Sequence, residues 1–397
     1  MEELITQYQA LLRQKFPKFK RYLYDEIHWE SRLIGVKGAR GTGKTTLLLQ
    51  WLKEQNLPAN KGIYISLDDI YFSQNDLKSV LVDFHEKGGE IVILDEVHKY
   101  PSWSTVIKNM YDFYPDLKII FTGSSIIDIS TQEADLSRRA VIYELPGLSY
   151  REFLALHYDL DLPKFTLKEL IEKKDSIYTS FPADFKPLEH FEAYLQLGYY
   201  PFLFKEPATS QFRMNQLIRT VVESDMAQLK DFDIRNARKM LQLLYVVAQQ
   251  VPFSPNISKL AEQTGIHRNT LNNYLHFLER AKLISLVYTA GNSTAILRKP
   301  DKIYLNNTAL VFALAKDKSN VGNIRETFFH SQVSQMSDIE LPKSGDFMVD
   351  NQYTFEVGGK NKTSKQIKEI ANAFLVKDDV AFGSGNTIPL WLFGFLY

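Results

Sequence analysis

The spacing of hydrophobic and polar positions changes several times along the chain, and each change marks a predicted element. In the first 30 residues, Leu4, Tyr8, Leu11 and Leu12 repeat at helical spacing, which predicts an amphipathic helix followed by a linker. Short apolar runs then alternate with helix-like segments. The runs that read as strands are 32–36, 62–67, 91–94, 118–122 and 141–145. This alternation predicts an α/β fold in which helices cover both faces of a parallel sheet.

The later parts of the chain follow other patterns. Residues 148–250 read mostly as helices interrupted by prolines. Residues 251–316 show a different spacing of hydrophobic positions, which is described below, and residues 317–397 return to mixed helix and strand. The apolar stretch 388–397 is too short to span a membrane and predicts a buried strand. We therefore expect five segments, with bounds 1–30, 31–147, 148–250, 251–316 and 317–397.

A glycine-rich turn follows the first predicted strand. It reads Gly-Ala-Arg-Gly-Thr-Gly-Lys-Thr over residues 38–45 and fits G-x-x-x-x-G-K-[ST], between an apolar strand and a helix-like run. The glycines allow backbone N–H groups to wrap phosphates, and the helix N-terminus adds partial positive charge. We expect Lys44 to reach the β- and γ-phosphates of ATP and the Thr45 hydroxyl to ligate Mg²⁺. The expected nucleotide-binding residues are Gly38, Ala39, Arg40, Gly41, Thr42, Gly43, Lys44, Thr45 and Thr46.

The apolar run 91–94 ends in two carboxylates, Asp95 and Glu96. In P-loop ATPases this arrangement is the Walker B strand. We expect Asp95 to hold Mg²⁺ and Glu96 to act as general base for the attacking water. The alternative is that the two acids only cap the start of a helix after a buried strand.

Two further groups are candidates for sensing or stabilising the γ-phosphate. The run 118–122 leads into hydroxyl residues, and in ATPases with an extra strand between the P-loop and Walker B strands a polar residue here contacts the γ-phosphate. Ser124 is the first candidate, ahead of Thr122 and Ser125. The alternative is an ordinary polar loop.

The second group is an arginine pair, Arg138 and Arg139. An arginine beside the γ-phosphate stabilises transition-state charge, and we expect Arg139 or its neighbour to do so, from its own subunit or from another copy in an oligomer. A solvated pair or a salt bridge is the alternative.

Residues 257–284 fit a helix-turn-helix, with Gly265 at the turn and 283–287 and 302–305 as wing strands. Arginine and asparagine side chains on the second helix are able to read base edges and phosphates. The residues expected to face DNA are Arg268, Asn269, Asn272 and Asn273. The alternative is that this helix is solvated or packs on another domain or a protein partner.

Three acids mark the C-terminal segment. Glu326 lies on a predicted helix, and Asp346 and Glu356 lie on successive strands, an arrangement found in the PD-(D/E)xK nuclease core. There the acids hold Mg²⁺ and a lysine two positions after the glutamate assists the nucleophile. Here that position is Gly358, and Lys360 comes two residues late. We expect a degenerate nuclease fold that serves binding or packing.

Composition narrows the classes of partner. The chain has 47 basic and 47 acidic residues, and a neutral protein is not expected to coat nucleic acid or a membrane surface, although a local basic patch remains compatible. It has no cysteine, which excludes disulfides and thiolate metal sites. The first residues do not resemble a signal peptide. We expect a soluble cytoplasmic protein without a membrane partner.

Taken together, these motifs resemble bacterial and archaeal ATPases of the AAA+ superfamily that carry a C-terminal nuclease-like domain of unknown function. The resemblance covers nearly the whole chain. The motifs that carry it are Gly38-Ala-Arg-Gly-Thr-Gly-Lys-Thr-Thr, Leu94-Asp-Glu-Val-His, Thr122-Gly-Ser-Ser, Leu136-Ser-Arg-Arg, Leu145-Pro-Gly-Leu-Ser-Tyr-Arg-Glu-Phe and Gly198-Tyr-Tyr-Pro.

The resemblance implies an ATPase core, a winged helix and a restriction-endonuclease-like end. This chain departs from the family pattern twice, with Leu-Ser-Arg-Arg in place of Leu-x-Gly-Arg and Glu-Val-Gly in place of Glu-x-Lys. The expected function is an ATP-hydrolysing switch that acts on DNA or on a protein partner. The alternatives are a metal-dependent nuclease coupled to ATP and a nucleotide-binding scaffold without turnover.

Overall fold

The computed structural model describes residues 1–58, 60–125, 136–229, 232–290, 299–315 and 321–397. The chain divides into two units. The first is Met1–Gly147 with Gln228–Lys230, and the second is Leu148–Ala227 with Asp231–Tyr397. Within the described ranges, no helix is both long enough and apolar enough to span a membrane.

A parallel sheet of five strands forms the centre of the first unit. The strands follow the order β2-β3-β4-β1-β5, and every neighbouring pair is parallel. Their bounds are β1 Leu33–Gly38, β2 Gly62–Ser66, β3 Ile91–Asp95, β4 Lys118–Ser124 and β5 Val141–Glu144. The predicted α/β fold is confirmed, and β4 is the extra strand between β1 and β3 that the sequence predicted. The carboxyl ends of β1, β3 and β4 therefore meet at one edge.

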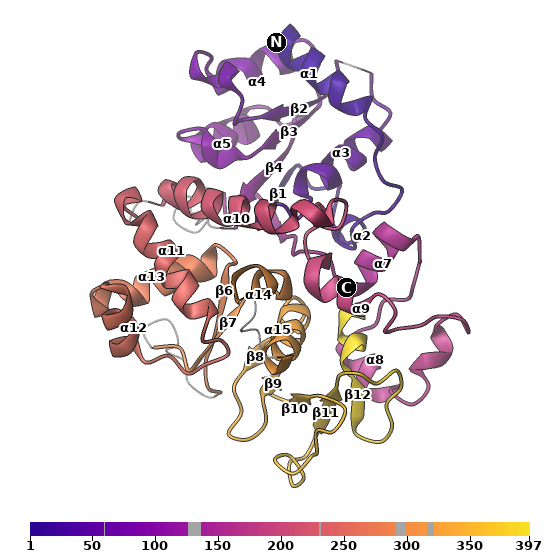
Figure 1. The fold of residues 1–397 in the computed structure, drawn as a ribbon. Helices are drawn as coiled ribbons and strands as arrows, with labels where there is room; N and C mark the ends of the chain where they lie inside the picture. Colours follow the sequence, from indigo (N-terminus) through magenta and orange to yellow (C-terminus); the bar gives the residue numbers. More distant parts are fainter. Residues whose placement is uncertain (59, 126–135, 230–231, 291–298, 316–320) are drawn as a thin grey trace. The chain divides into compact units, whose positions relative to one another are not determined.

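Helices flank this sheet on both sides. The chain crosses from β1 to the far strand β2 through α3 (Lys44–Glu54) and then returns strand by strand through α4 (Leu77–Glu86) and α5 (Trp103–Phe113). Right-handed crossovers in opposite directions place α3 on one face and α4 and α5 on the other, as Figure 1 shows. Short 3₁₀ turns η1 (Ile70–Ser73) and η2 (Val97–Lys99) follow β2 and β3.

The N-terminal segment is tied to α3. It contains α1 (Glu2–Leu12), on which Leu4 and Tyr8 are buried as the stripe predicts, and α2 (Leu23–Glu26).

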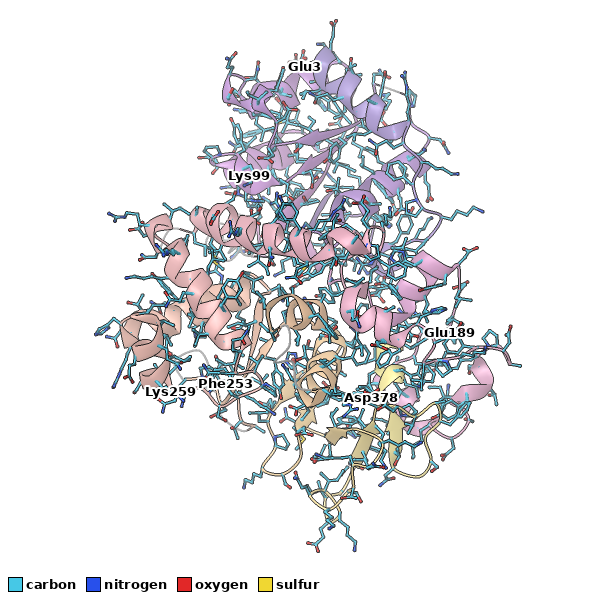
Figure 2. The ribbon with its side chains drawn as sticks, in the orientation of Figure 1. Glu3, Lys99, Glu189, Phe253, Lys259 and Asp378 are labelled. Carbon is cyan, nitrogen blue, oxygen red and sulfur yellow. The ribbon has the colours of Figure 1, made fainter. Side chains whose placement is uncertain are left out.

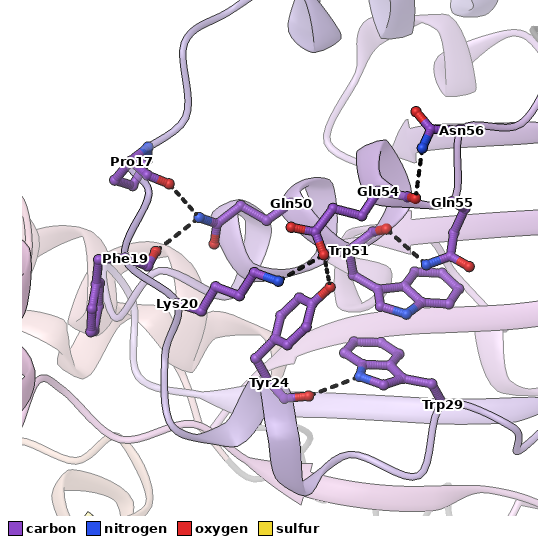
Figure 3. Close-up of polar contacts among 10 residues, drawn as sticks. All are labelled: Pro17, Phe19, Lys20, Tyr24, Trp29, Gln50, Trp51, Glu54, Gln55 and Asn56. Atoms are coloured by element: carbon purple, nitrogen blue, oxygen red, sulfur yellow. Dashed lines mark hydrogen bonds and ion pairs between the residues drawn. The ribbon is translucent and has the colours of Figure 1, made fainter. Parts of the chain in front are cut away.

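Figure 3 shows the polar contacts that hold the linker. Gln50 Nε2 donates to the carbonyls of Pro17 at 2.9 Å and Phe19 at 3.0 Å, and Glu54 Oε2 accepts from Tyr24 OH at 2.5 Å. The linker is therefore fastened to the helix that begins at the P-loop.

The second unit opens with helices broken by many tight turns. The α-helices are α7 Tyr150–Tyr158, α8 Leu167–Glu172, α9 Phe191–Ala193, α10 Ser210–Thr220 and α11 Ala237–Ala248. The 3₁₀ and π turns are η4 Ile177–Ser180, η5 Tyr194–Gly198, η6 Pro207–Thr209, η7 Val221–Asp225, η8 Met226–Gln228 and η9 Ile234–Asn236. This region agrees with the mostly helical pattern of the sequence.

A helix-turn-helix with two antiparallel strands follows. Its elements are α12 Ile257–Thr264, α13 Arg268–Arg280, β6 Ile284–Val287 and β7 Lys302–Leu305. Gly265 ends α12 with φ 65°, a left-handed conformation that favours glycine. The next two helices are α14 Thr308–Ala315 and α15 Val321–Val333.

A second sheet of five strands completes the unit, in the order β12-β11-β10-β9-β8. Its strands are β8 Ile339–Glu340, β9 Phe347–Val349, β10 Tyr353–Gly358, β11 Ala373–Lys377 and β12 Thr387–Pro389. The pairs β8–β9 and β9–β10 are antiparallel, whereas β10–β11 and β11–β12 are parallel. On α15, Phe329 lies 5.1 Å from Phe355 of β10, ring centroid to centroid.

The C-terminal stretch corrects one prediction. Residues 388–397 are buried, as expected, but only the first two belong to a strand. The chain continues as the 3₁₀ helix η12 (Leu390–Phe395). Pro389 lacks the N–H that a ladder needs, so the strand ends there.

Candidate functional site

The glycine-rich turn lies at the carboxyl end of β1 and leads into α3. Gly41 and Gly43 have φ of 82° and 96°, which side-chain-bearing residues rarely adopt. A Cβ on Gly38 would lie 2.4 Å from the carbonyl oxygen of Leu145, so only glycine fits at that position. Thr42 closes the turn by donating from Oγ1 to Ala39 O at 2.9 Å. The loop thus has the conformation that backbone wrapping of a phosphate requires.

Lys44 is buried at the mouth of this loop. Its Nζ donates to the carbonyl oxygens of Gly38 at 3.0 Å and Ala39 at 3.1 Å. The ammonium is therefore held directly against the turn that precedes it.

Asp95 is the point at which three elements converge. Its Oδ2 accepts from Thr45 Oγ1 at 2.7 Å and from Tyr64 OH at 2.5 Å, and its Oδ1 accepts from Thr122 Oγ1. Parallel neighbours explain this convergence, because β2 with Tyr64 and β4 with Thr122 flank the end of β3. Burial and the Asp95 charge raise the pKa of Tyr64 above its usual range.

Glu96 follows in a left-handed conformation, with φ 54°. Its backbone N–H donates to Thr122 Oγ1 at 3.0 Å. On η2, His98 places Nε2 3.3 Å from Glu96 Oε2. Burial lowers the pKa of His98 to about 3, and the charges of Lys99, Lys44 and Arg40 act in the same direction. Its imidazole is therefore neutral at pH 7.

The sequence ranked Ser124 ahead of Thr122 among the β4 hydroxyls, and the observed contacts reverse that order. Thr122 contacts both the Asp95 carboxylate and the Glu96 backbone, whereas Ser124 is buried two residues further on, opposite Gly38 in the β1 register. The geometry favours Thr122 over Ser124 as the polar residue beside the two acids.

The arginine pair contains one residue with a well-defined acidic partner. Arg139 donates from Nε to Asp112 Oδ1 at 2.8 Å and from a terminal nitrogen to Oδ2 at 3.0 Å, while Arg138 is exposed. This is the salt-bridge arrangement, and a catalytic role for Arg139 stays a prediction.

Sequence reasoning did not identify Arg21 or Tyr64 as partners of the site's backbone and acids, and it ranked Thr122 behind Ser124. Arg21 is only 5% exposed and donates to Thr42 O at 2.5 Å, Pro146 O at 2.8 Å and Gly147 O at 2.9 Å. A single arginine in a linker gives no local signal of such long-range contacts.

On α13, Arg268, Asn269 and Asn273 are exposed, whereas Asn272 is half-buried. Lys259 on α12, labelled in Figure 2, is also exposed.

Two side chains of β7, the second predicted wing strand, donate hydrogen bonds to α15. Glu326 Oε2 accepts from Lys302 Nζ at 2.7 Å and from Tyr304 OH at 2.8 Å. The Lys302 ammonium is therefore already paired with a carboxylate inside the second unit.

The three C-terminal acids lie in one neighbourhood. Asp346 Oδ2 accepts from the Val357 N–H at 2.8 Å, and burial raises the pKa of Asp346 to about 6, with Glu326 and Glu356 adding repulsion. Across the part of the chain that is described, however, no three histidine or acidic groups are arranged to hold a metal ion.

Lys362 occupies the place of the lysine that the Glu-x-Lys pattern expects at position 358. Its Nζ lies 2.6 Å from Oε1 of the fully buried Glu356. A Cβ on Gly358 would lie 2.6 Å from Lys362 Cγ, so the lysine stem fills the space of a side chain at 358. The sequence directed attention to Lys360, which is exposed.

The fold and the glycine loop are those of an α/β P-loop domain. Residues 30–154 match the family model of an AAA domain, and residues 188–321 match a domain of unknown function (DUF8612). The match to the AAA domain covers the glycine loop and all five strands of the first sheet, and it supports nucleotide binding there.

One archaeal protein is similar to this chain over most of its length. The chain is 26% identical over 382 residues to Uncharacterized protein MJ1637 of Methanocaldococcus jannaschii, covering 88% of this chain and 80% of that protein.

Among solved structures, AMPPCP-bound DnaA from Aquifex aeolicus aligns at 15% identity over 70% of this chain and 89% of its own, with a TM-score of 0.25. The replication initiator DnaA bound to AMPPCP and single-stranded DNA aligns at 17% identity over 64% and 84%, with a TM-score of 0.27.

Proposed function

We propose that this protein is a Mg²⁺-dependent ATPase that uses the nucleotide to switch its interaction with a DNA or protein partner. One observation carries the proposal. The Thr45 hydroxyl of the P-loop lies 2.7 Å from Asp95, fifty positions later in the sequence, at the edge where β1, β3 and β4 end.

The donor set suits a nucleotide with its magnesium ion. The Thr45 hydroxyl and the Asp95 carboxylate are oxygen ligands of the kind that Mg²⁺ prefers, and they would hold the ion directly or through its waters. The ion would neutralise charge on the phosphates. Lys44 and the backbone N–H groups of the loop bind and orient the β- and γ-phosphates.

Glu96 is the proposed general base. Its carboxylate accepts a proton from the water that attacks the γ-phosphorus, and the Thr122 hydroxyl fixes its backbone at 3.0 Å. Contacts made only with the γ-phosphate favour one conformation over another, which is how hydrolysis would bias a partner-binding surface.

Glu96→Gln separates binding from turnover. We expect the variant to bind a fluorescent ATP analogue as tightly as the wild type while turnover falls by about 100-fold or more. Glu90→Gln is the matched control, because Glu90 precedes the opposite end of β3 and pairs with Lys61 at 2.5 Å on the surface. Turnover by Glu96→Gln at the wild-type rate would show that Glu96 is not the base.

For the partner, we propose duplex DNA contacted by α13. Arg268 and Asn273 are exposed on one helix that follows a tight turn, and both side chains are able to donate to phosphates and bases. The double variant Arg268→Ala/Asn273→Ala should weaken DNA binding and flatten its salt dependence. Lys168→Ala, at an exposed site on α8, is the charge-matched control. Binding that is absent, or unchanged in the double variant, would direct the search to a protein partner.

A second candidate function is phosphodiester cleavage at the C-terminal acids. The position of Lys362 favours this function. Its ammonium lies beside Glu356 and supplies the positive charge that Gly358, at the position expected for the lysine, lacks. Glu326, Asp346 and Glu356 would have to converge further to bind a divalent cation, since the structure does not arrange them so among its described residues.

Plasmid nicking tests this second function. Nicking that requires a divalent metal, survives Lys44→Ala and disappears in Glu356→Gln would support it. An absence of nicking with Mg²⁺, Mn²⁺ and Ca²⁺ alike would end it.

A further inference from the structure

His98 is a buried histidine that the proposed mechanism does not yet use. Its side chain is 3% exposed, and neither ring nitrogen makes a hydrogen bond of ordinary geometry within the described part of the chain. Leaving a polar nitrogen buried without such a bond destabilises the folded chain. A leucine or phenylalanine would fill the same space without that cost.

The neighbouring Glu96 carboxylate identifies what the His98 ring is suited to contact. His98 Nε2 lies 3.3 Å from Glu96 Oε2. An ionised carboxylate only accepts hydrogen bonds, so an attractive contact requires the ring proton to be on Nε2. Burial beside the Lys44 and Arg40 charges keeps the ring uncharged at neutral pH, as its lowered pKa indicates.

We propose that His98 is a positioning residue that orients the Glu96 carboxylate for catalysis. The inference rests on the proposed ATPase function, in which Glu96 is the base. The ring would hold Oε2 while the carboxylate accepts the proton of the attacking water. Glu96 would then be fixed at two points, by Thr122 at its backbone and by His98 at its carboxylate.

A neutral donor suits this task better than a cation. A charged imidazolium would bind the carboxylate strongly and make it a poorer base, whereas a neutral N–H orients it with a smaller effect on its basicity. Orientation matters because a misplacement of about 1 Å in a reacting group can cost about 100-fold in rate.

Three substitutions separate this role from simple packing. In His98→Gln, the amide nitrogen lies four bonds from Cα, as Nε2 does in histidine, so it is able to donate to Glu96. In His98→Asn the amide is one bond too short, and His98→Leu fills the space without a donor. We expect Gln to keep kcat within about threefold of the wild type, and Asn and Leu to lower it by about 10- to 100-fold.

Binding and a double-mutant cycle complete the test. The Kd for a fluorescent non-hydrolysable ATP analogue should stay within about twofold in all three variants, which also shows that they fold. His98→Leu should cause no further loss in a Glu96→Gln background, because the two residues act as a unit.

Three results would overturn the inference: full activity of His98→Leu, equal losses in the Gln and Leu variants, or losses that add to that of Glu96→Gln. A Glu96→Gln variant that turns over at the wild-type rate would instead remove Glu96 as the base, and an absence of ATP turnover in the wild type would overturn the proposed function itself. An inactive Glu96→Gln beside an active His98→Leu would overturn only the role of His98.

Discussion

Asp95 receives hydroxyl hydrogen bonds from three different elements: from Thr45 of α3, Tyr64 of β2 and Thr122 of β4. If Asp95 helps to hold Mg²⁺, the Thr45 hydroxyl also binds the ion. The Tyr64 hydroxyl then orients the Asp95 carboxylate. Partners of this kind tune metal affinity strongly.

Tyr64→Phe tests this role by removing one oxygen and keeping the ring. We expect the Mg²⁺ concentration for half-maximal turnover to rise by about tenfold. Tyr8→Phe, which alters another buried tyrosine of the same unit, is the control. An unchanged Mg²⁺ titration in Tyr64→Phe would remove Tyr64 from the site.

Asp346 gives a pH-dependent prediction. Burial raises its pKa to about 6 from the ordinary 3.8, so the folded chain holds this proton more tightly than the unfolded chain does. The stability that the group contributes is present below about pH 4 and is lost as the pH rises through 6.

Asp346→Asn keeps an acceptor for the Val357 N–H and cannot ionise. Its midpoint of thermal unfolding should therefore exceed that of the wild type by a few degrees at pH 8, with a difference that shrinks toward pH 4. Asp338→Asn, at an exposed position, should show no such trend. A constant difference at both pH values would contradict the assignment.

At the scale of elements, two helices of the second unit begin with the same capping box in different surroundings. On α7, Ser149 accepts from the Glu152 N–H and also donates to Tyr397 O at 2.7 Å, all of it buried. On α8, Thr166 and Glu169 form an exposed box.

Ser149→Ala should destabilise the protein more than Thr166→Ala does. The first change loses the cap and a buried hydrogen bond, for about 2 kcal/mol, whereas the second loses an exposed cap, for about 0.5–1 kcal/mol. Chemical denaturation of both variants measures the difference. Equal losses would mean that the contact with Tyr397 contributes no stability.

Elements were predictable where their signal was local. The five strands of the first sheet and the glycine turn follow from short apolar runs and a contiguous motif. The 3₁₀ helix at Leu390–Phe395 was not predictable from the sequence. An apolar stretch of that length has no periodicity that distinguishes a helix from a buried strand.

Site residues were also predictable where they belong to a contiguous motif. Lys44, Thr45, Asp95 and Glu96 belong to motifs, and the structure brings their segments together at one sheet edge. The contacts of Thr122 with those acids depend on strand order, and the place of Lys362 depends on a loop that folds back over Gly358. Neither follows from spacing along the chain.

At the scale of the whole molecule, Arg21 connects the P-loop to the last residues of the first unit. Its buried guanidinium caps carbonyls at Thr42 and at Pro146 and Gly147, just before the chain enters the second unit. The residue thus links the conformation of the nucleotide loop to the start of the connection.

Arg21→Gln should lower both the affinity for nucleotide, by about tenfold, and the unfolding temperature, because it leaves buried carbonyls unpaired. Its neighbour Lys20 pairs with Glu54 at the surface, so Lys20→Gln should change either quantity little. Nucleotide titration and thermal unfolding measure both. Wild-type affinity in Arg21→Gln would show that the P-loop holds its shape without this residue.

The central claim is that the loop from Gly38 to Thr45 hydrolyses ATP. Steady-state ATP turnover with Mg²⁺, compared among the wild type, Lys44→Ala and Lys53→Ala, tests it most directly. Lys53 is the control because it lies on the same helix and donates to Leu12 O at 2.9 Å, away from the loop. We predict turnover that requires Mg²⁺, persists in Lys53→Ala and is lost in Lys44→Ala; equal turnover in Lys44→Ala and the wild type would contradict the account.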